Sequence, residues 1–90
     1  MTEQPMRLND LPVVVDGPGD YVTRDGRRVT IREVHDSTPG TTSFGAKGSL
    51  WTERRGVLRA RGHDIWHISG RHMVLRETSR DIVGRWAIQI

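Results

Sequence analysis

Histidines and a neighbouring aspartate are the residues whose types first suggest chemistry in this sequence. His63 and His67 are four residues apart, and His72 follows the short Gly70-Arg71 turn. Asp64 could add an oxygen ligand to a metal site. A zinc ion needs three or four ligands arranged as a tetrahedron, and a two-residue turn would not place all three histidines on one face. We therefore expect no metal and no other cofactor, and we interpret the histidines as turn and surface residues.

The same histidines, with Glu33, Glu53 and the arginines, supply the residue types of a small metal-independent ribonuclease. That reaction needs a base for the 2′-hydroxyl, an acid for the leaving oxygen and a cation beside the phosphate. Residue types do not show that these groups converge, and the sequence has no phosphate-binding glycine loop and no nucleophile elbow. We expect a non-enzymatic protein and keep the ribonuclease as a remote alternative.

The segment 53–61, Glu-Arg-Arg-Gly-Val-Leu-Arg-Ala-Arg, is the strongest candidate for contact with a partner. On a strand, Arg59 and Arg61 share one face with Val57, while Arg54 and Arg55 fall in the preceding turn. Thirteen of the 14 basic residues are arginine, whose planar guanidinium binds carboxylates and phosphates through two parallel hydrogen bonds. A solvated outer face, and the codon usage of a GC-rich genome, remain the alternatives.

Three tryptophans are the largest apolar side chains, and each can bury roughly 200 Å². We expect at least two of them to be structural. Trp66 shares one face of its strand with Ile68, and Ile65 lies on the other face, so both faces carry apolar residues. This pattern indicates either a central strand or one turned toward a partner. A second basic patch is expected at the tip of an earlier hairpin. The predicted partner-contact residues are Arg54, Arg55, Arg59, Arg61, Arg27, Arg28 and Trp66.

Composition limits the class of protein further. Ninety residues suffice for one domain, and a hydrophobic content of 34% is below the roughly 45% of an average globular domain. The chain has no cysteine, which excludes disulfides and thiolate metal sites. No apolar run approaches the ~20 residues that span a bilayer, and the N-terminus does not resemble a signal peptide. We expect a cytoplasmic protein with no membrane contact.

Charge is distributed unevenly along the chain. Residues 1–20 contain one basic and four acidic residues, a net charge of −3, whereas residues 21–90 have a net charge of +6. Residues 1–19 are also rich in proline and glycine. They are expected to form an extended or mobile N-terminal arm, followed by a single small β domain at 20–90.

The Asp25-Gly26 pair between two β-rich runs predicts a hairpin with a two-residue type I′ turn. This register pairs Val22 with Val29 and places both of them on one face with Ile31. Further strands are expected at 44–51, 57–61, 65–69, 72–76 and 85–90, with turns at 62–64 and 70–71 and one short helical turn near 79–83. The predicted fold class is all-β, either a small antiparallel barrel or a strongly curled meander sheet.

The run 21–31, Tyr-Val-Thr-Arg-Asp-Gly-Arg-Arg-Val-Thr-Ile, resembles the opening of small β proteins carried by tailed bacteriophages and prophages. Later pieces of the resemblance are Gly48-Ser49-Leu50-Trp51 and Ser79-Arg80-Asp81-Ile82-Val83. It covers about residues 20–86 and brings no catalytic residues with it. It implies an accessory factor that antagonises host defence, of which a CRISPR inhibitor is one kind.

We therefore expect a binding protein that blocks a host macromolecule through an arginine-rich surface, and the alternative is a small nucleic-acid-binding β-barrel. The partner is either a host protein complex with an acidic surface or a nucleic acid. The sequence does not determine the oligomeric state, and a homodimer is one of the alternatives.

Overall fold

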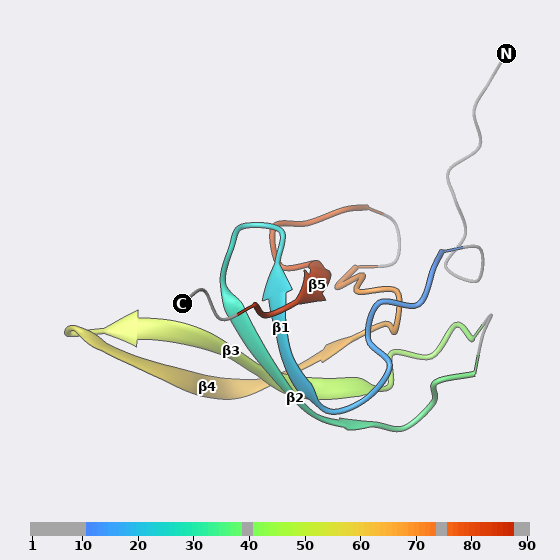
Figure 1. The fold of residues 1–90 in the computed structure, drawn as a ribbon, viewed down its shortest axis with the longest axis horizontal. Helices are drawn as coiled ribbons and strands as arrows, with labels where there is room; N and C mark the ends of the chain where they lie inside the picture. The colour runs from blue at the N-terminus through green and yellow to red at the C-terminus, as the bar shows by residue number, and fades with distance from the viewer. Residues whose placement is uncertain (1–10, 39–40, 74–75, 88–90) are drawn as a thin grey trace, which may run out of the picture.

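The computed structural model describes residues 11–38, 41–73 and 76–87. Its strands form one antiparallel sheet in the order β4-β3-β2-β1-β5. They are β1 (Gly19–Thr23), β2 (Arg28–Val34), β3 (Ala46–Arg54), β4 (Val57–Trp66) and β5 (Ile82–Arg85). The first four follow one another as a meander, and β5 returns to pair with β1 (Figure 1). The all-β prediction is confirmed as a curled open sheet. The barrel alternative is wrong, because the edge strands β4 and β5 do not pair.

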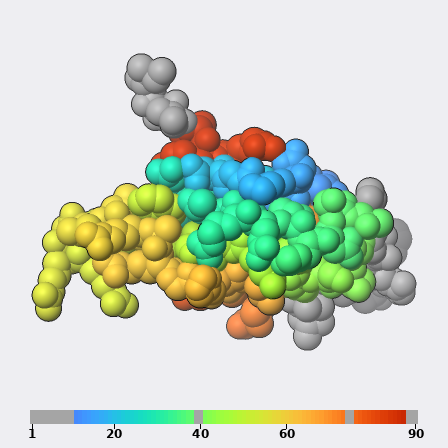
Figure 2. Space-filling view, turned by 90° about the horizontal axis from the view of Figure 1, so that it is seen from below, coloured from blue at the N-terminus to red at the C-terminus, as the bar shows by residue number. Residues whose placement is uncertain are grey.

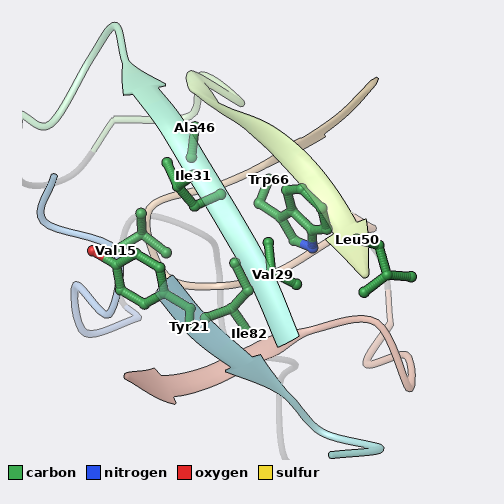
Figure 3. Close-up of a cluster of buried hydrophobic side chains, with 8 residues drawn as sticks. All are labelled: Val15, Tyr21, Val29, Ile31, Ala46, Leu50, Trp66 and Ile82. Carbon is green, nitrogen blue, oxygen red and sulfur yellow. The ribbon is translucent and has the colours of Figure 1, made fainter. Parts of the chain in front are cut away.

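One face of the sheet is buried and forms the core. Tyr21, Val29 and Leu50 are direct cross-strand neighbours and make one row of it. The residues of the core cluster are Val15, Tyr21, Val29, Ile31, Ala46, Leu50, Trp66 and Ile82 (Figure 3). Alternate residues of a strand point to the same face, so the period-two pattern of the sequence produces this surface.

Part of the predicted N-terminal arm belongs to the core. Val15 is completely buried, and the amides of Val14 and Val15 both donate to the carbonyl of Ile68 at 2.8 Å. Residues 1–10 of that predicted arm lie outside the described residues. The segment just before β1 therefore helps to close the open face of the sheet.

The β1–β2 hairpin forms where it was predicted, but its register differs by one residue. Tyr21 pairs with Val29, and Val22 pairs with Arg28. Tyr21 therefore takes the buried position that the sequence analysis assigned to Val22. A one-residue shift exchanges the two faces of a strand, and the larger apolar surface of the tyrosine ring favours the register that buries it.

The turn of this hairpin is not type I′, because Gly26 has a positive φ of 87° whereas Asp25 does not. The amide of Thr23 donates to the Arg27 carbonyl at 2.8 Å. The amide of Arg27 in turn donates to the Thr23 hydroxyl at 3.0 Å. These bonds close a three-residue loop with glycine in the left-handed position, a common hairpin geometry.

β4 is one continuous strand where a turn at residues 62–64 was predicted. Gly62, with φ 72°, is the extra residue of a β-bulge, and the pairing with β3 shifts between Gly48 and Leu50. The true turn of the β3–β4 hairpin is Arg55-Gly56, with φ angles of 52° and 76°. Positive φ at both residues is the geometry of a type I′ turn.

The C-terminal part also departs from the prediction. In place of a helical turn near 79–83, the amide of Asp81 closes a single turn on the Thr78 carbonyl at 3.2 Å, and the extended strand β5 follows at once. Residues 72 and 73 are not in a strand, and the rest of the predicted 72–76 strand includes residues 74–75, which the structure does not describe. Of the predicted 85–90 strand, only Arg85 lies in β5, and residues 88–90 are outside the described part.

Candidate interaction surface

The end of the β3–β4 hairpin projects beyond the rest of the sheet. β2 pairs with β3 only as far as Leu50, so the two strands continue alone to their turn (Figure 1). The space-filling view shows the same segment extending from the body (Figure 2). Residues 53–60 are all exposed. We call residues 52–61 the protruding hairpin.

The two faces of the protruding hairpin differ in composition. Arg61 pairs with the core residue Leu50, and Arg54 pairs with Val57. Since alternate residues share a face, Arg54, Arg59 and Arg61 lie with Val57 on the face that continues the core side of the sheet. The predicted common face of Arg59, Arg61 and Val57 is thus confirmed. Arg54 was predicted to lie in the turn, but it is the last residue of β3 and joins this face. The other face carries Leu58 and Ala60 beside Trp51.

The arginines of the protruding hairpin have no acidic partners in the described part of the chain. Residues 52–61 contain four arginines and one glutamate, a net charge of +3, and none of the ion pairs found there involves these arginines. In the body some arginines are paired, since Arg27 pairs with Asp25 at 2.8 Å and Arg28 with Asp20 at 2.5 Å, whereas other basic residues, such as Arg80, form no ion pair among the described residues. Within the ten residues of the protruding hairpin, four arginines therefore lie close together without an acidic partner.

Arg28 and its neighbours form a structural cluster on the outer face of the sheet. Its guanidinium stacks over Trp51 at 4.4 Å and lies 6.0 Å from the centre of the Trp86 ring. The Thr30 hydroxyl donates to Asp20 at 2.6 Å and accepts from the Trp51 indole at 2.8 Å. The hydrogen bond from Thr30, and then the one from Arg28, hold the pKa of Asp20 below its usual value. Arg27 and Arg28 are thus engaged by the carboxylates of Asp25 and Asp20 and are not part of the protruding hairpin.

Trp66 is completely buried, so the prediction that it contacts a partner is wrong. Its indole N–H donates to the Arg80 carbonyl at 2.9 Å. The reason is the bulge at Gly62. Arg61 and Trp66 are five residues apart and would face opposite sides of a regular strand, but the extra residue brings both to the core side.

A hollow of about 340 Å³ lies at the root of the protruding hairpin. Arg54 and Arg61 line it from the hairpin, and Arg80 lines it from the turn before β5. Its other lining residues are Leu50, Thr52, Gly62, His63 and Asp64. The sequence analysis did not select Arg80, because tertiary hydrogen bonds bring that distant turn here, among them the bond from the Trp66 indole to the Arg80 carbonyl.

The four histidines have separate partners and do not converge. No group of three or more potential metal ligands occurs among the described residues. The partners are Glu33 for His35 (3.3 Å), Arg32 for His63 (2.9 Å), Thr41 and Ser69 for His67 (2.6 and 2.8 Å) and Asp64 for His72 (2.9 Å). A second hollow of about 470 Å³ on the outer face has a mixed lining of Arg32, Glu33, Lys47, Gly48, His63, Asp64 and Ile65.

Comparison of the chain with protein-family models, with curated proteins and with solved structures finds no match. What the fold and the surface define is a class, an all-β domain with one open sheet and a basic hairpin that projects from it. Within residues 11–38, 41–73 and 76–87, no helix is long and apolar enough to cross a membrane.

Proposed function

We propose that this chain is a non-enzymatic binding protein that engages an anionic macromolecule with the protruding hairpin and blocks access to it. The observation that supports the proposal is the uncompensated charge of Arg54, Arg55, Arg59 and Arg61. Arg54, Arg55 and Arg59 are exposed, and exposed side chains usually change stability by less than about 0.5 kcal/mol, so these three arginines contribute little to the fold. An arginine buried in an interface can contribute 2 kcal/mol or more, on the order of a thirtyfold change in affinity.

The resemblance to phage proteins suggests the setting. A small accessory protein of that kind would block a component of host defence, such as a CRISPR effector. The sign of the charge on the protruding hairpin indicates which kind of surface the protein would block. A protein that imitates DNA carries negative charge, whereas the protruding hairpin has a net charge of +3. The proposed inhibitor would occupy an acidic protein face or a nucleic-acid backbone.

The test reverses charge on the protruding hairpin. Arg54→Glu with Arg59→Glu changes two exposed residues on its arginine face, and the partner captured by the wild-type protein from a host lysate is identified by mass spectrometry. The affinity of that purified partner is then measured for each variant. We expect the double variant to bind at least tenfold more weakly.

The matched control is Lys47→Glu with Arg76→Glu, which changes the net charge equally at two exposed residues outside the protruding hairpin. Equal losses from both double variants would indicate diffuse electrostatic attraction and would contradict a defined site. Loss of folding in the hairpin variant alone, detected by circular dichroism, would show that its arginines are structural.

A further inference from the structure

The arginine face of the protruding hairpin presents charge in a row. Arg59 and Arg61 are two residues apart on β4, so their α-carbons are separated by about 7 Å. Arg54 adds a third guanidinium from the neighbouring strand, opposite Val57. A row of this kind suits a ligand with repeated negative charges, such as a polymer of phosphates, better than a single carboxylate.

The hollow at the root of the hairpin extends this row and is suited to hold one phosphate group. Arg54, Arg61 and Arg80 converge on it, and none of them forms an ion pair within the described residues. The Nε atom of Arg61 is buried and has no hydrogen-bond partner there. A buried N–H without an acceptor is unfavourable, and a bound phosphate oxygen would supply one.

The surroundings of the hollow favour an anion. Leu50, only 8% exposed, forms part of its wall, and an apolar wall strengthens electrostatic attraction. Asp64 is the acidic residue of the lining. Both of its carboxylate oxygens lie 2.9 Å from the Nε2 atom of His72, and the three arginines of the lining outnumber its single negative charge.

The arrangement of the tryptophans favours double-stranded over single-stranded nucleic acid. Binding of single strands relies on aromatic side chains on which the bases stack. The arginine face carries no aromatic residue among those described. Trp66 is buried, and Trp51 lies on the opposite face with its indole bonded to Thr30.

The shape of the protruding hairpin distinguishes between duplexes. The major groove of B-form DNA is about 12 Å wide and admits a two-stranded β-ribbon. The major groove of an RNA duplex is too narrow for side chains to enter. Beyond the pairing with β2, the protruding hairpin consists of two strands with both faces exposed.

We infer that the protruding hairpin binds duplex DNA by entering its major groove. Arg54, Arg59, Arg61 and Arg80 each contact one backbone phosphate, and the hollow lies where the contacts of Arg61 and Arg80 meet. This inference rests on the proposed function for the use of the hairpin as the binding element, and it names the partner. Phosphate contacts carry no base information, so binding is largely independent of DNA sequence.

The experiment measures binding of the full chain to a fluorescent DNA duplex of about 20 base pairs by anisotropy, over a series of salt concentrations. Four phosphate contacts predict that log K falls with log salt with a slope of about −3.6. Arg59→Gln and Arg80→Gln should each reduce that slope by about one unit. The control, Arg76→Gln, removes an exposed arginine that belongs neither to the protruding hairpin nor to the hollow. It should leave the slope unchanged.

Competing probes distinguish the alternatives. We expect the DNA duplex to bind more tightly than either the matching single strand or an RNA duplex. We also expect inorganic phosphate at millimolar concentration not to displace the duplex. Tighter binding of the single strand, displacement by free phosphate, or slopes that do not respond to Arg59 and Arg80 would overturn the inference.

The outcomes also separate this inference from the proposed function. Absence of DNA binding at about 50 mM salt, where phosphate contacts are strong, would overturn the inference alone if charge reversal on the hairpin still abolished binding of a captured protein. If neither DNA nor a captured partner responded to the hairpin arginines, both proposals would fail. Because Arg59 and Arg80 are exposed, we expect their variants to fold, and circular dichroism checks this.

Discussion

Replacing Gly48 by alanine tests the close approach of β2 and β3 that shapes the sheet. A Cβ atom at this position would lie 2.1 Å from the Thr30 carbonyl oxygen and 2.9 Å from the Cα atom of Ile31. Both are backbone atoms of β2, held by the pairing of Gly48 with Ile31 and of Ser49 with Thr30. No change of rotamer can relieve the clash, so the strands must separate.

The expected loss of stability follows from this geometry. Ordinary carbon–oxygen contact begins near 3.4 Å, so a contact of 2.1 Å requires the strands to open by more than 1 Å. Overpacking costs about 1–3 kcal/mol, and each weakened ladder hydrogen bond adds about 1 kcal/mol. We expect Gly48→Ala to lose about 3–5 kcal/mol of unfolding free energy, a large part of the roughly 5–13 kcal/mol typical of 90 residues.

Urea denaturation followed by tryptophan fluorescence measures the effect, since the fully buried Trp66 should report unfolding. Gly17→Ala is the control, because nothing lies within 4 Å of its added Cβ, and its free energy should change by less than about 0.5 kcal/mol. Gly26→Ala meets no atom but has a φ of 87°, so it should lose about 1–2 kcal/mol from backbone strain alone. A Gly48→Ala midpoint equal to that of Gly17→Ala would refute the reasoning.

Three further substitutions test individual contacts. The hydrogen bond from Thr30 lowers the pKa of Asp20, so its stabilisation is present above pH about 4 and is lost as the pH falls. Asp20→Asn should therefore be less stable than the wild type at neutral pH, and urea titrations should show this difference shrinking as the pH falls below about 4. Asp81 is 2% exposed and accepts the amide and hydroxyl of Thr78 at 3.0 Å, so Asp81→Ala should lower the unfolding free energy by about 2–3 kcal/mol. Burial raises the pKa of Tyr21, so this group contributes stability below pH about 10 that is lost as the pH rises, and Tyr21→Phe should flatten the fall of melting temperature between about pH 9 and 11. A pH dependence identical to the wild type in either the Asp20 or the Tyr21 variant, or an unchanged Asp81→Ala midpoint, would contradict the corresponding assignment.

The features that the sequence alone determined are local. Alternation of apolar residues predicts an all-β domain, and Asp25-Gly26 marks the place of the first hairpin. The common face of Val57, Arg59 and Arg61 also follows from their spacing, since side chains two residues apart on one strand point the same way. Each of these properties depends on neighbours in the chain, so no distant contact was needed to predict it.

Register and bulges required the tertiary structure. Val29 pairs with Tyr21 and not with Val22, and this choice depends on which of the two side chains the assembled core can bury. The bulge at Gly62 reverses the facing of β4, and for this reason Trp66 is a core residue and not a partner contact. An extra residue in one strand has no sequence pattern of its own, because it is set by the fit between two paired strands.

The composition of the binding surface was also decided in three dimensions. Arginine content alone did not separate Arg28, which Asp20 and Trp51 engage, from the uncompensated arginines of the protruding hairpin. Arg80 joins Arg61 at the hollow because the buried Trp66 and backbone bonds from distant segments hold that turn. Charge compensation and convergence depend on distances between remote segments, and those distances exist only once the chain has folded.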